Sequence, residues 1–241
     1  MLASESVSTA RAILRPLTPA QDDFFVGDEI RCEIWKSMTS LPRLYAILDA
    51  SCFPDSRVLF STAQELFAGG VSLLQYRHKR GNARQMLEQA RELRSWLVEP
   101  VKLIMNDRAD LCLAAGYDGV HLGQEDLSPE GARRVIGERL WLGVSTHNPE
   151  QITEADATSA DYIAIGPVFS TTSKANPDPV VGLEGIRKAR TLTRKPLVAI
   201  GGINRVNCRS VIEAGADSVA VISDLMREPR KSAEEILRIL G

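Results

Sequence analysis

The residues best suited to chemistry follow short apolar runs, and the first such group is Gln75, Arg77 and Lys79. Side chains alternate along a strand, so these three share one face if the segment is extended. Burying two cations without an anion would cost several kcal/mol, so a bound diphosphate would explain them if that face points inward. The alternative is a solvated strand end. His78 falls on the opposite face, where only its backbone would line a site.

Carboxylates follow the next two apolar runs, as Asn106-Asp107 and then as Asp126. Mg²⁺ prefers oxygen ligands and commonly uses one or two carboxylates together with substrate phosphate oxygens. The pair Asp107 and Asp126, beside two cations, therefore predicts a metal-diphosphate site. The alternative for Asp126 is a helix N-cap, but Ser128 before a proline is the better cap and leaves Asp126 free.

Two later groups could hold anions. Residues 170–174 form a hydroxyl-rich segment that ends in Lys174, although such segments are often solvated turns. Gly201 and Gly202 follow another apolar run, and Ile222-Ser223 close the last one. Backbone N–H groups there, with a helix N-terminus behind them, can hold a phosphate without Arg or Lys. A plain tight turn is the alternative, for Gly201 more than for Gly202.

The alternation of short apolar runs and amphipathic stretches from Leu41 onward predicts the elements that position these groups. The helical stretches, such as Ala83 to Leu97, carry apolar residues at helical spacing and would pack on a parallel sheet. The apolar runs are Leu44 to Leu48, Val71 to Tyr76, Val101 to Met105, Gly119 to Leu122, Trp141 to Ser145, Tyr162 to Ile165, Pro196 to Ile200 and Ser218 to Ile222. Eight such units predict an α/β fold, a single (β/α)8 TIM barrel over residues 41–241, with its chemistry at the carboxyl ends of the strands.

Composition bounds the class of protein. The chain has 241 residues, 44% hydrophobic and 25% charged, which is typical of a globular domain. Its net charge of -2 provides no basic field for nucleic acid or an anionic membrane, and no apolar run could span a bilayer. The four cysteines are far apart, which favours neither a disulfide framework nor a zinc site and predicts a cytoplasmic protein. The sequence leaves the oligomeric state open, a homo-oligomer included.

Taken together, the motifs resemble those of the thiamin phosphate synthase family over residues 43–226. They are Gln-x-Arg-x-Lys at 75–79, Asn-Asp-Arg at 106–108, Gly-Val-His-Leu-Gly-Gln-Glu-Asp at 119–126, Gly-Val-Ser at 143–145, Gly-Pro at 166–167 with Thr-x-Ser-Lys at 171–174, and Gly-Gly-Ile at 201–203. Each motif is loose, but six in order at the ends of successive strands are specific. Ser173 stands where family members often have Thr, which keeps the hydroxyl.

The resemblance implies an alkyl transferase of thiamin biosynthesis that joins an aminopyrimidine diphosphate to a thiazole phosphate and releases pyrophosphate. It implies that Mg²⁺ is bound by Asp107 and Asp126. It places the pyrimidine diphosphate on Gln75, Tyr76, Arg77, His78, Lys79, Asn106, Ser145 and Lys174, and the thiazole phosphate on Thr171, Thr172, Ser173, Gly202, Ile222 and Ser223. Arg77, Lys79 and Lys174 would act catalytically, by stabilising charge on the departing diphosphate.

Two other functions compete with this interpretation. A thiazole tautomerase of the same superfamily would keep the phosphate pocket and use an acid-base residue, for which His147 is the candidate. A non-catalytic phosphate-binding barrel would need no complete rim of charged residues. The full set of cations and both aspartates argue against each, and we expect structural roles for His121 and His147.

Residues 1–40 lack periodicity and predict a poorly ordered N-terminal extension. We therefore expect that deleting residues 1–38 leaves the barrel folded and its activity largely intact. Solubility and kcat/KM of the truncated chain at fixed Mg²⁺ check this. Insolubility, or loss of most of kcat/KM, would mean that the extension packs against the barrel.

Overall fold

The computed structural model describes residues 41–96, 101–171 and 178–241. Eight parallel strands pair in sequence order, and β1 also pairs with β8, so that the sheet closes into a barrel. The strands are β1 (Leu44–Asp49), β2 (Leu73–Arg77), β3 (Lys102–Asn106), β4 (Gly119–Leu122), β5 (Trp141–Thr146), β6 (Tyr162–Ile165), β7 (Leu197–Ile200) and β8 (Ser218–Val221). The predicted (β/α)8 barrel is confirmed.

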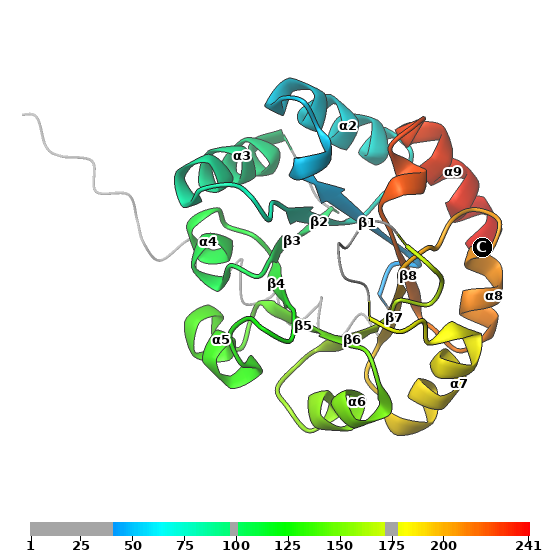
Figure 1. The fold of residues 1–241 in the computed structure, drawn as a ribbon. Helices are drawn as coiled ribbons and strands as arrows, with labels where there is room; N and C mark the ends of the chain where they lie inside the picture. The colour runs from blue at the N-terminus through cyan, green and yellow to red at the C-terminus, as the bar shows by residue number, and fades with distance from the viewer. Residues whose placement is uncertain (1–40, 97–100, 172–177) are drawn as a thin grey trace, which may run out of the picture. The chain divides into compact units, whose positions relative to one another are not determined.

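Helices follow the strands and ring the barrel on its outside (Figure 1). In the described part of the chain they are α2 (Ser56–Ala68), α3 (Ala83–Trp96), α4 (Ala109–Ala114), α5 (Pro129–Ile136), α6 (Pro149–Asp156), α7 (Gly182–Leu192), α8 (Cys208–Glu213) and α9 (Pro229–Leu240), with short 3₁₀ helices η1 (Ala50–Cys52) and η2 (Ser223–Leu225). Ser128 caps α5, as predicted, because its hydroxyl accepts the Gly131 N–H at 3.1 Å.

Element boundaries differ from the expected ones by one or two residues. β2 begins at Leu73 rather than Val71 and ends at Arg77. Lys79 therefore lies beyond the strand, where alternation alone cannot fix the direction of its side chain. The predicted residues 1–40, Leu97, Thr172, Ser173 and Lys174 fall outside the described residues.

Two separate cores lie on the two sides of the sheet. The larger one packs between strands and helices and contains the apolar side chains that alternate outward, such as Leu44 and Leu74. The inner one contains Tyr45, Trp141 and Tyr162, whose rings contact one another at centroid distances of 6.1 Å (Tyr45 to Tyr162) and 5.9 Å (Trp141 to Tyr162). A Cβ on Gly143 would lie 2.0 Å from the Tyr162 ring, so only glycine leaves room for that tyrosine.

An aspartate precedes each even strand from β4 to β8 and makes the same contacts each time. The carboxylates of Asp118, Asp161 and Asp217 accept the backbone N–H of Leu103, Leu142 and Leu197 in the preceding strands at 2.9, 2.8 and 2.7 Å. Each also pairs with an arginine of the helix that leads into that preceding strand, namely Arg94 of α3, Arg133 of α5 and Arg190 of α7. These three clamps join neighbouring strands at the amino end of the barrel, where side chains serve stability.

The remaining expectations concern cysteines and membrane segments. Cys52, Cys112 and Cys208 are free thiols, and Cys32 lies outside the described residues. Among the described helices, none is long and apolar enough to cross a bilayer. The cytoplasmic location and the oligomeric state stay predictions.

We expect Asp161→Ala to lower the free energy of unfolding by about 3 kcal/mol, because it leaves the buried guanidinium of Arg133 without its carboxylate. Urea unfolding followed by circular dichroism measures this. Glu184→Ala is the matched control, since its pair with Arg187 is exposed and contributes little. Equal losses in the two variants would contradict the role of the clamp.

Candidate active site

At the carboxyl ends of β1 and β2, Arg77 is paired with a carboxylate of the protein. The register of the two strands places Asp49 opposite Arg77, and the Arg77 guanidinium donates a hydrogen bond to Asp49 Oδ2. Asp49 is only 5% exposed, and its Oδ1 accepts the Ser51 N–H at 3.0 Å. The charge of Arg77 is therefore already balanced within the protein, so its burial alone does not require a bound diphosphate.

Lys79 is also paired, with Asp107 at the end of β3. Its ammonium donates to Asp107 Oδ2, and the side chain of Asp107 is 18% exposed whereas that of Lys79 is 48% exposed. Asp107 has φ 62°, the one positive φ outside glycine among the described residues. Such a backbone is strained for most side chains, and it turns the carboxylate of Asp107 away from the path of the strand.

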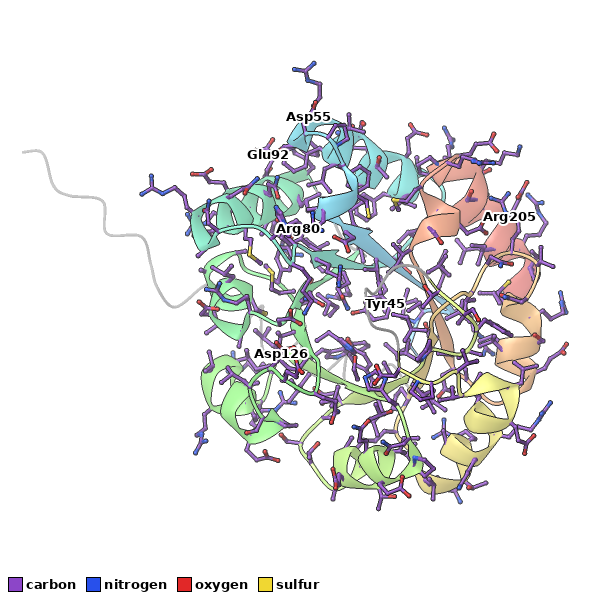
Figure 2. The ribbon with its side chains drawn as sticks, in the orientation of Figure 1. Tyr45, Asp55, Arg80, Glu92, Asp126 and Arg205 are labelled. Atoms are coloured by element: carbon purple, nitrogen blue, oxygen red, sulfur yellow. The ribbon has the colours of Figure 1, made fainter. Side chains whose placement is uncertain are left out.

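Asp126 brings a second carboxylate to the same point. Its Oδ2 accepts the Gly123 N–H at 2.7 Å, which fixes the side chain at the β4 end, and Figure 2 shows it between the barrel and α5. Burial raises the pKa of Asp107, Lys79 opposes this effect, and a hydrogen bond and the charge of Asp126 add to it. Two adjacent carboxylates of this kind favour a bound cation. Among the described residues no group of three or more His, Cys, Asp or Glu side chains could hold a metal ion.

Four predicted contacts of the pyrimidine lie on β2, β3 and β5, and only some face inward. Gln75 and Ser145 point into the barrel, where Gln75 makes a buried hydrogen bond and Ser145 a part-buried one. Asn106 is 8% exposed at the end of β3. Tyr76 points outward, because its hydroxyl donates to Gln89 of α3 at 2.6 Å, so only its backbone faces the site.

His78 also points away from the strand ends. It lines a cavity of about 310 Å³ between η1 and α3, together with Phe53 and Gln85, and its Nδ1 is buried without a partner in the described residues. As with Tyr76, only the backbone of His78 can line the site.

The ends of β7 and β8 present free backbone donors. Gly201 and Gly202 have φ values of 100° and 64°, and within the described residues the N–H groups of Gly202 and Ser223 have no acceptor. A Cβ on Gly202 would lie 2.6 Å from the Ser170 carbonyl oxygen. A side chain at position 202 would therefore clash with the backbone of the segment after β6, whereas the N–H of Gly202 stays unpaired within the described residues. Ile222 is half-buried and Ser223 is exposed beside it.

The two histidines near the rim are held by protein groups. His121 lies between the Tyr162 hydroxyl and Ser145 Oγ, and burial lowers the pKa of His121 to about 4. His147 contacts the Gly166 carbonyl oxygen through Nδ1 at 2.6 Å and Asp178 Oδ2 through Nε2 at 3.4 Å. Both ring nitrogens of each histidine are thus engaged.

Sequence reasoning missed three residues of the site: Asp49, Tyr45 and Tyr162. Asp49 directly follows the first apolar run and shares the inward face of Tyr45 and Ile47, so alternation could have found it. Tyr45 and Tyr162 stand inside apolar runs, where nothing separates a packed ring from a ring whose hydroxyl has a role.

Comparisons with known proteins agree on one family. Residues 44–225 match the family described as thiamine monophosphate synthase. The chain belongs to this family. The predicted resemblance to thiamin phosphate synthases is thereby confirmed.

Individual relatives of known name cover most of the chain. The thiamine-phosphate synthase of Koribacter versatilis is 63% identical over 203 residues, which cover 83% of this chain and 96% of the relative. That of Chloroflexus aurantiacus is 44% identical over 75% of this chain and 83% of the relative. The solved thiamine phosphate pyrophosphorylase from Pyrococcus furiosus superposes with a TM-score of 0.74 at 36% identity, over 82% of this chain and 95% of that one.

Proposed function

We propose that this site joins 4-amino-2-methyl-5-(diphosphomethyl)pyrimidine to a thiazole phosphate, giving thiamin phosphate and pyrophosphate. The enzyme is a transferase of thiamine biosynthesis by family. The observation that carries the proposal is the division of one rim between two anion-binding halves. Cations and carboxylates occupy the β2 to β4 ends, and free backbone donors occupy the β7 and β8 ends.

In the first half, Arg77 and Lys79 would bind the diphosphate. Both are held before substrate arrives by the carboxylates of Asp49 and Asp107, so little reorganisation is needed. Lys174, outside the described residues, would join them from the segment after β6. Gln75, Asn106 and Ser145, with the backbone of Tyr76 and His78, would surround the pyrimidine.

Asp107 and Asp126 would hold Mg²⁺. The fit rests on their proximity and on the raised pKa of Asp107, which a nearby cation would relieve. When bound, the ion would supply positive charge to the diphosphate as it departs.

In the second half, the thiazole phosphate would bind the N–H groups of Gly202 and Ser223, with Ile222 beside them. Thr171, together with Thr172 and Ser173 outside the described residues, would close this half from the segment after β6. Short distances between the two bound substrates would provide proximity.

The reaction is largely dissociative. The bond between the pyrimidine's exocyclic methylene and the diphosphate oxygen breaks, and the electron pair leaves with the diphosphate. The thiazole nitrogen then donates its lone pair to the methylene cation, so a C–N bond replaces a C–O bond and no proton moves. Arg77, Lys79 and Lys174 stabilise the leaving group, and no protein nucleophile is required.

The tautomerase alternative depends on His147 as an acid-base residue. Its two ring nitrogens are occupied by the Gly166 carbonyl and by Asp178, which favours a structural role. This geometry supports the synthase over the tautomerase.

The direct test is to incubate both substrates with Mg²⁺ and to follow thiamin phosphate and pyrophosphate. We expect equal amounts of the two products. Conversion of a thiazole tautomer without pyrophosphate would support the tautomerase, and no conversion at all would support a binding protein.

We expect Asp107→Ala and Asp126→Ala each to raise the Mg²⁺ requirement and to lower kcat, because the interaction strengthens as charge develops on the leaving group. Because both would serve one ion, the double variant should lose much less than the product of the two single losses. Lys174→Ala should lower kcat with a smaller change in apparent Mg²⁺ affinity. Mg²⁺ titrations of the initial rate measure these effects, and an unaltered Mg²⁺ curve in both aspartate variants would refute the scheme.

A further inference from the structure

A continuous chain of hydrogen bonds crosses the interior of the barrel beneath the rim. Gln75 Nε2 donates to the Tyr45 hydroxyl at 2.9 Å, and the hydroxyls of Tyr45 and Tyr162 are 3.0 Å apart. The Tyr162 hydroxyl lies 3.0 Å from His121 Nδ1, and His121 Nε2 lies 2.9 Å from Ser145 Oγ. The chain joins β2, β1, β6, β4 and β5, and Figure 2 shows Tyr45 within the ring of strands.

The rings that carry this chain are fixed by packing. Tyr45 and Tyr162 are each 1% exposed, and Tyr162 stacks on His121 with centroids 5.5 Å apart. Gly143 leaves the space that the Tyr162 ring fills. The hydroxyls therefore cannot turn to other partners, and a buried polar group without a partner would cost about 1–3 kcal/mol.

Counting protons gives the chain a direction. An amide nitrogen only donates, so Tyr45 accepts from Gln75 and must give its own proton to the Tyr162 oxygen. Tyr162 then has one proton left, for which His121 Nδ1 is the acceptor. A neutral His121 must therefore carry its proton on Nε2 and donate to Ser145. The hydroxyls of Tyr45 and Tyr162 and both ring nitrogens of His121 are then satisfied, and the tautomer of His121 follows from the orientation of Gln75.

The two ends of the chain remain open toward the rim. Among the described residues, the carboxamide oxygen of Gln75 has no donor, and the Ser145 hydroxyl has its proton left to give. One end accepts a hydrogen bond and the other donates one. An amino group beside a ring nitrogen offers the complementary donor and acceptor, which is the pattern of an aminopyrimidine.

We propose that Tyr45, Tyr162 and His121 are positioning residues that fix the donor and acceptor ends of Gln75 and Ser145, and so select a 4-amino over a 4-oxo pyrimidine. This inference rests on the proposed function in that it takes Gln75 and Ser145 as contacts of the pyrimidine ring. A 4-oxo group would bring its oxygen to the carboxamide oxygen of Gln75, and its ring N–H to the Ser145 proton. The contact at Gln75 would be repulsive, because two acceptors would face each other while the carboxamide N–H stays committed to Tyr45. The Ser145 hydroxyl keeps a second lone pair and can turn to accept the ring N–H, so the discrimination comes from the Gln75 end.

The tautomer can be tested without any substrate. The protein has 3 histidines, so ¹⁵N-edited NMR can resolve the imidazole signals of His121. These signals are assigned from their loss in His121→Asn. We expect Nε2 protonated and Nδ1 bare in the parent, and a change in this pattern in Tyr162→Phe. A parent with Nδ1 protonated would overturn the proposed direction.

Selectivity is tested by kinetics with the two pyrimidine diphosphates. In Tyr162→Phe the ratio of kcat/KM for the amino over the oxo substrate should fall about tenfold, the worth of one hydrogen bond, while KM for the thiazole phosphate stays unchanged. Tyr117→Phe is the matched control, because its buried hydroxyl has no partner in the described residues and stands outside the chain. It should keep the parent ratio.

The outcomes separate the inference from the proposed function. If the parent makes no thiamin phosphate, the proposed function is wrong, but the NMR result still decides the direction of the hydrogen-bond chain. An active parent whose ratio is unchanged in Tyr162→Phe overturns the positioning role. If Tyr162→Phe does not fold, Tyr45→Phe breaks the chain beside Gln75, and an unchanged ratio there has the same meaning.

Discussion

Closure of the sheet between β1 and β8 is the constraint on which the rest of the structure depends. It pairs Leu44 with Val219, residues from opposite ends of the barrel sequence, and gathers eight strand ends into one ring. The Asp118, Asp161 and Asp217 clamps lie at the other end of the same strands and tie neighbouring strands through charged hydrogen bonds. Stability is thereby built at the amino end, which leaves the carboxyl end free to carry strained and charged groups such as Asp107.

A closed barrel also encloses space that must be filled without unsatisfied polar atoms. Glycines at 119 and 143 make room for Trp141 and Tyr162, and the tyrosines Tyr45 and Tyr162 bring hydroxyls into the interior. Once inside, each hydroxyl needs both a donor and an acceptor, and the chain from Gln75 to Ser145 supplies them. The packing of the barrel interior therefore also fixes the hydrogen bonds that reach the rim. If one of the tyrosine rings shifted, its hydroxyl would lose its partners and the chain from Gln75 to Ser145 would break.

Much of this could be predicted from the sequence because it depends on local pattern. The eight apolar runs, the Ser128 cap and the neighbouring positions of Asp107 and Asp126 all follow from spacing and from the topology of a barrel. The pairing of Arg77 with Asp49 did not, since it depends on the register between two strands. The backbone contact that surrounds Gly202 depends on a loop from β6, and the roles of Tyr45 and Tyr162 depend on three-dimensional packing. The sequence pattern predicts which residues lie at the strand ends, whereas the register between strands decides which of their side chains are in contact.

The ion pairs at the strand ends change the expected attraction of the rim for a diphosphate. Arg77 and Lys79 alone would attract a bare diphosphate, but they are accompanied by Asp49, Asp107 and Asp126, so two positive and three negative groups give these five a net charge of -1. Such a cluster does not favour an anion by charge alone. With the proposed Mg²⁺ the same groups would carry a net charge of +1 (-1 plus 2), and a diphosphate would then be attracted. Arg77 and Lys79 thus each keep a carboxylate partner in the free enzyme, whereas Asp126 is held by the Gly123 N–H. With the proposed ion bound, the rim would favour a diphosphate over the same anion without a divalent cation.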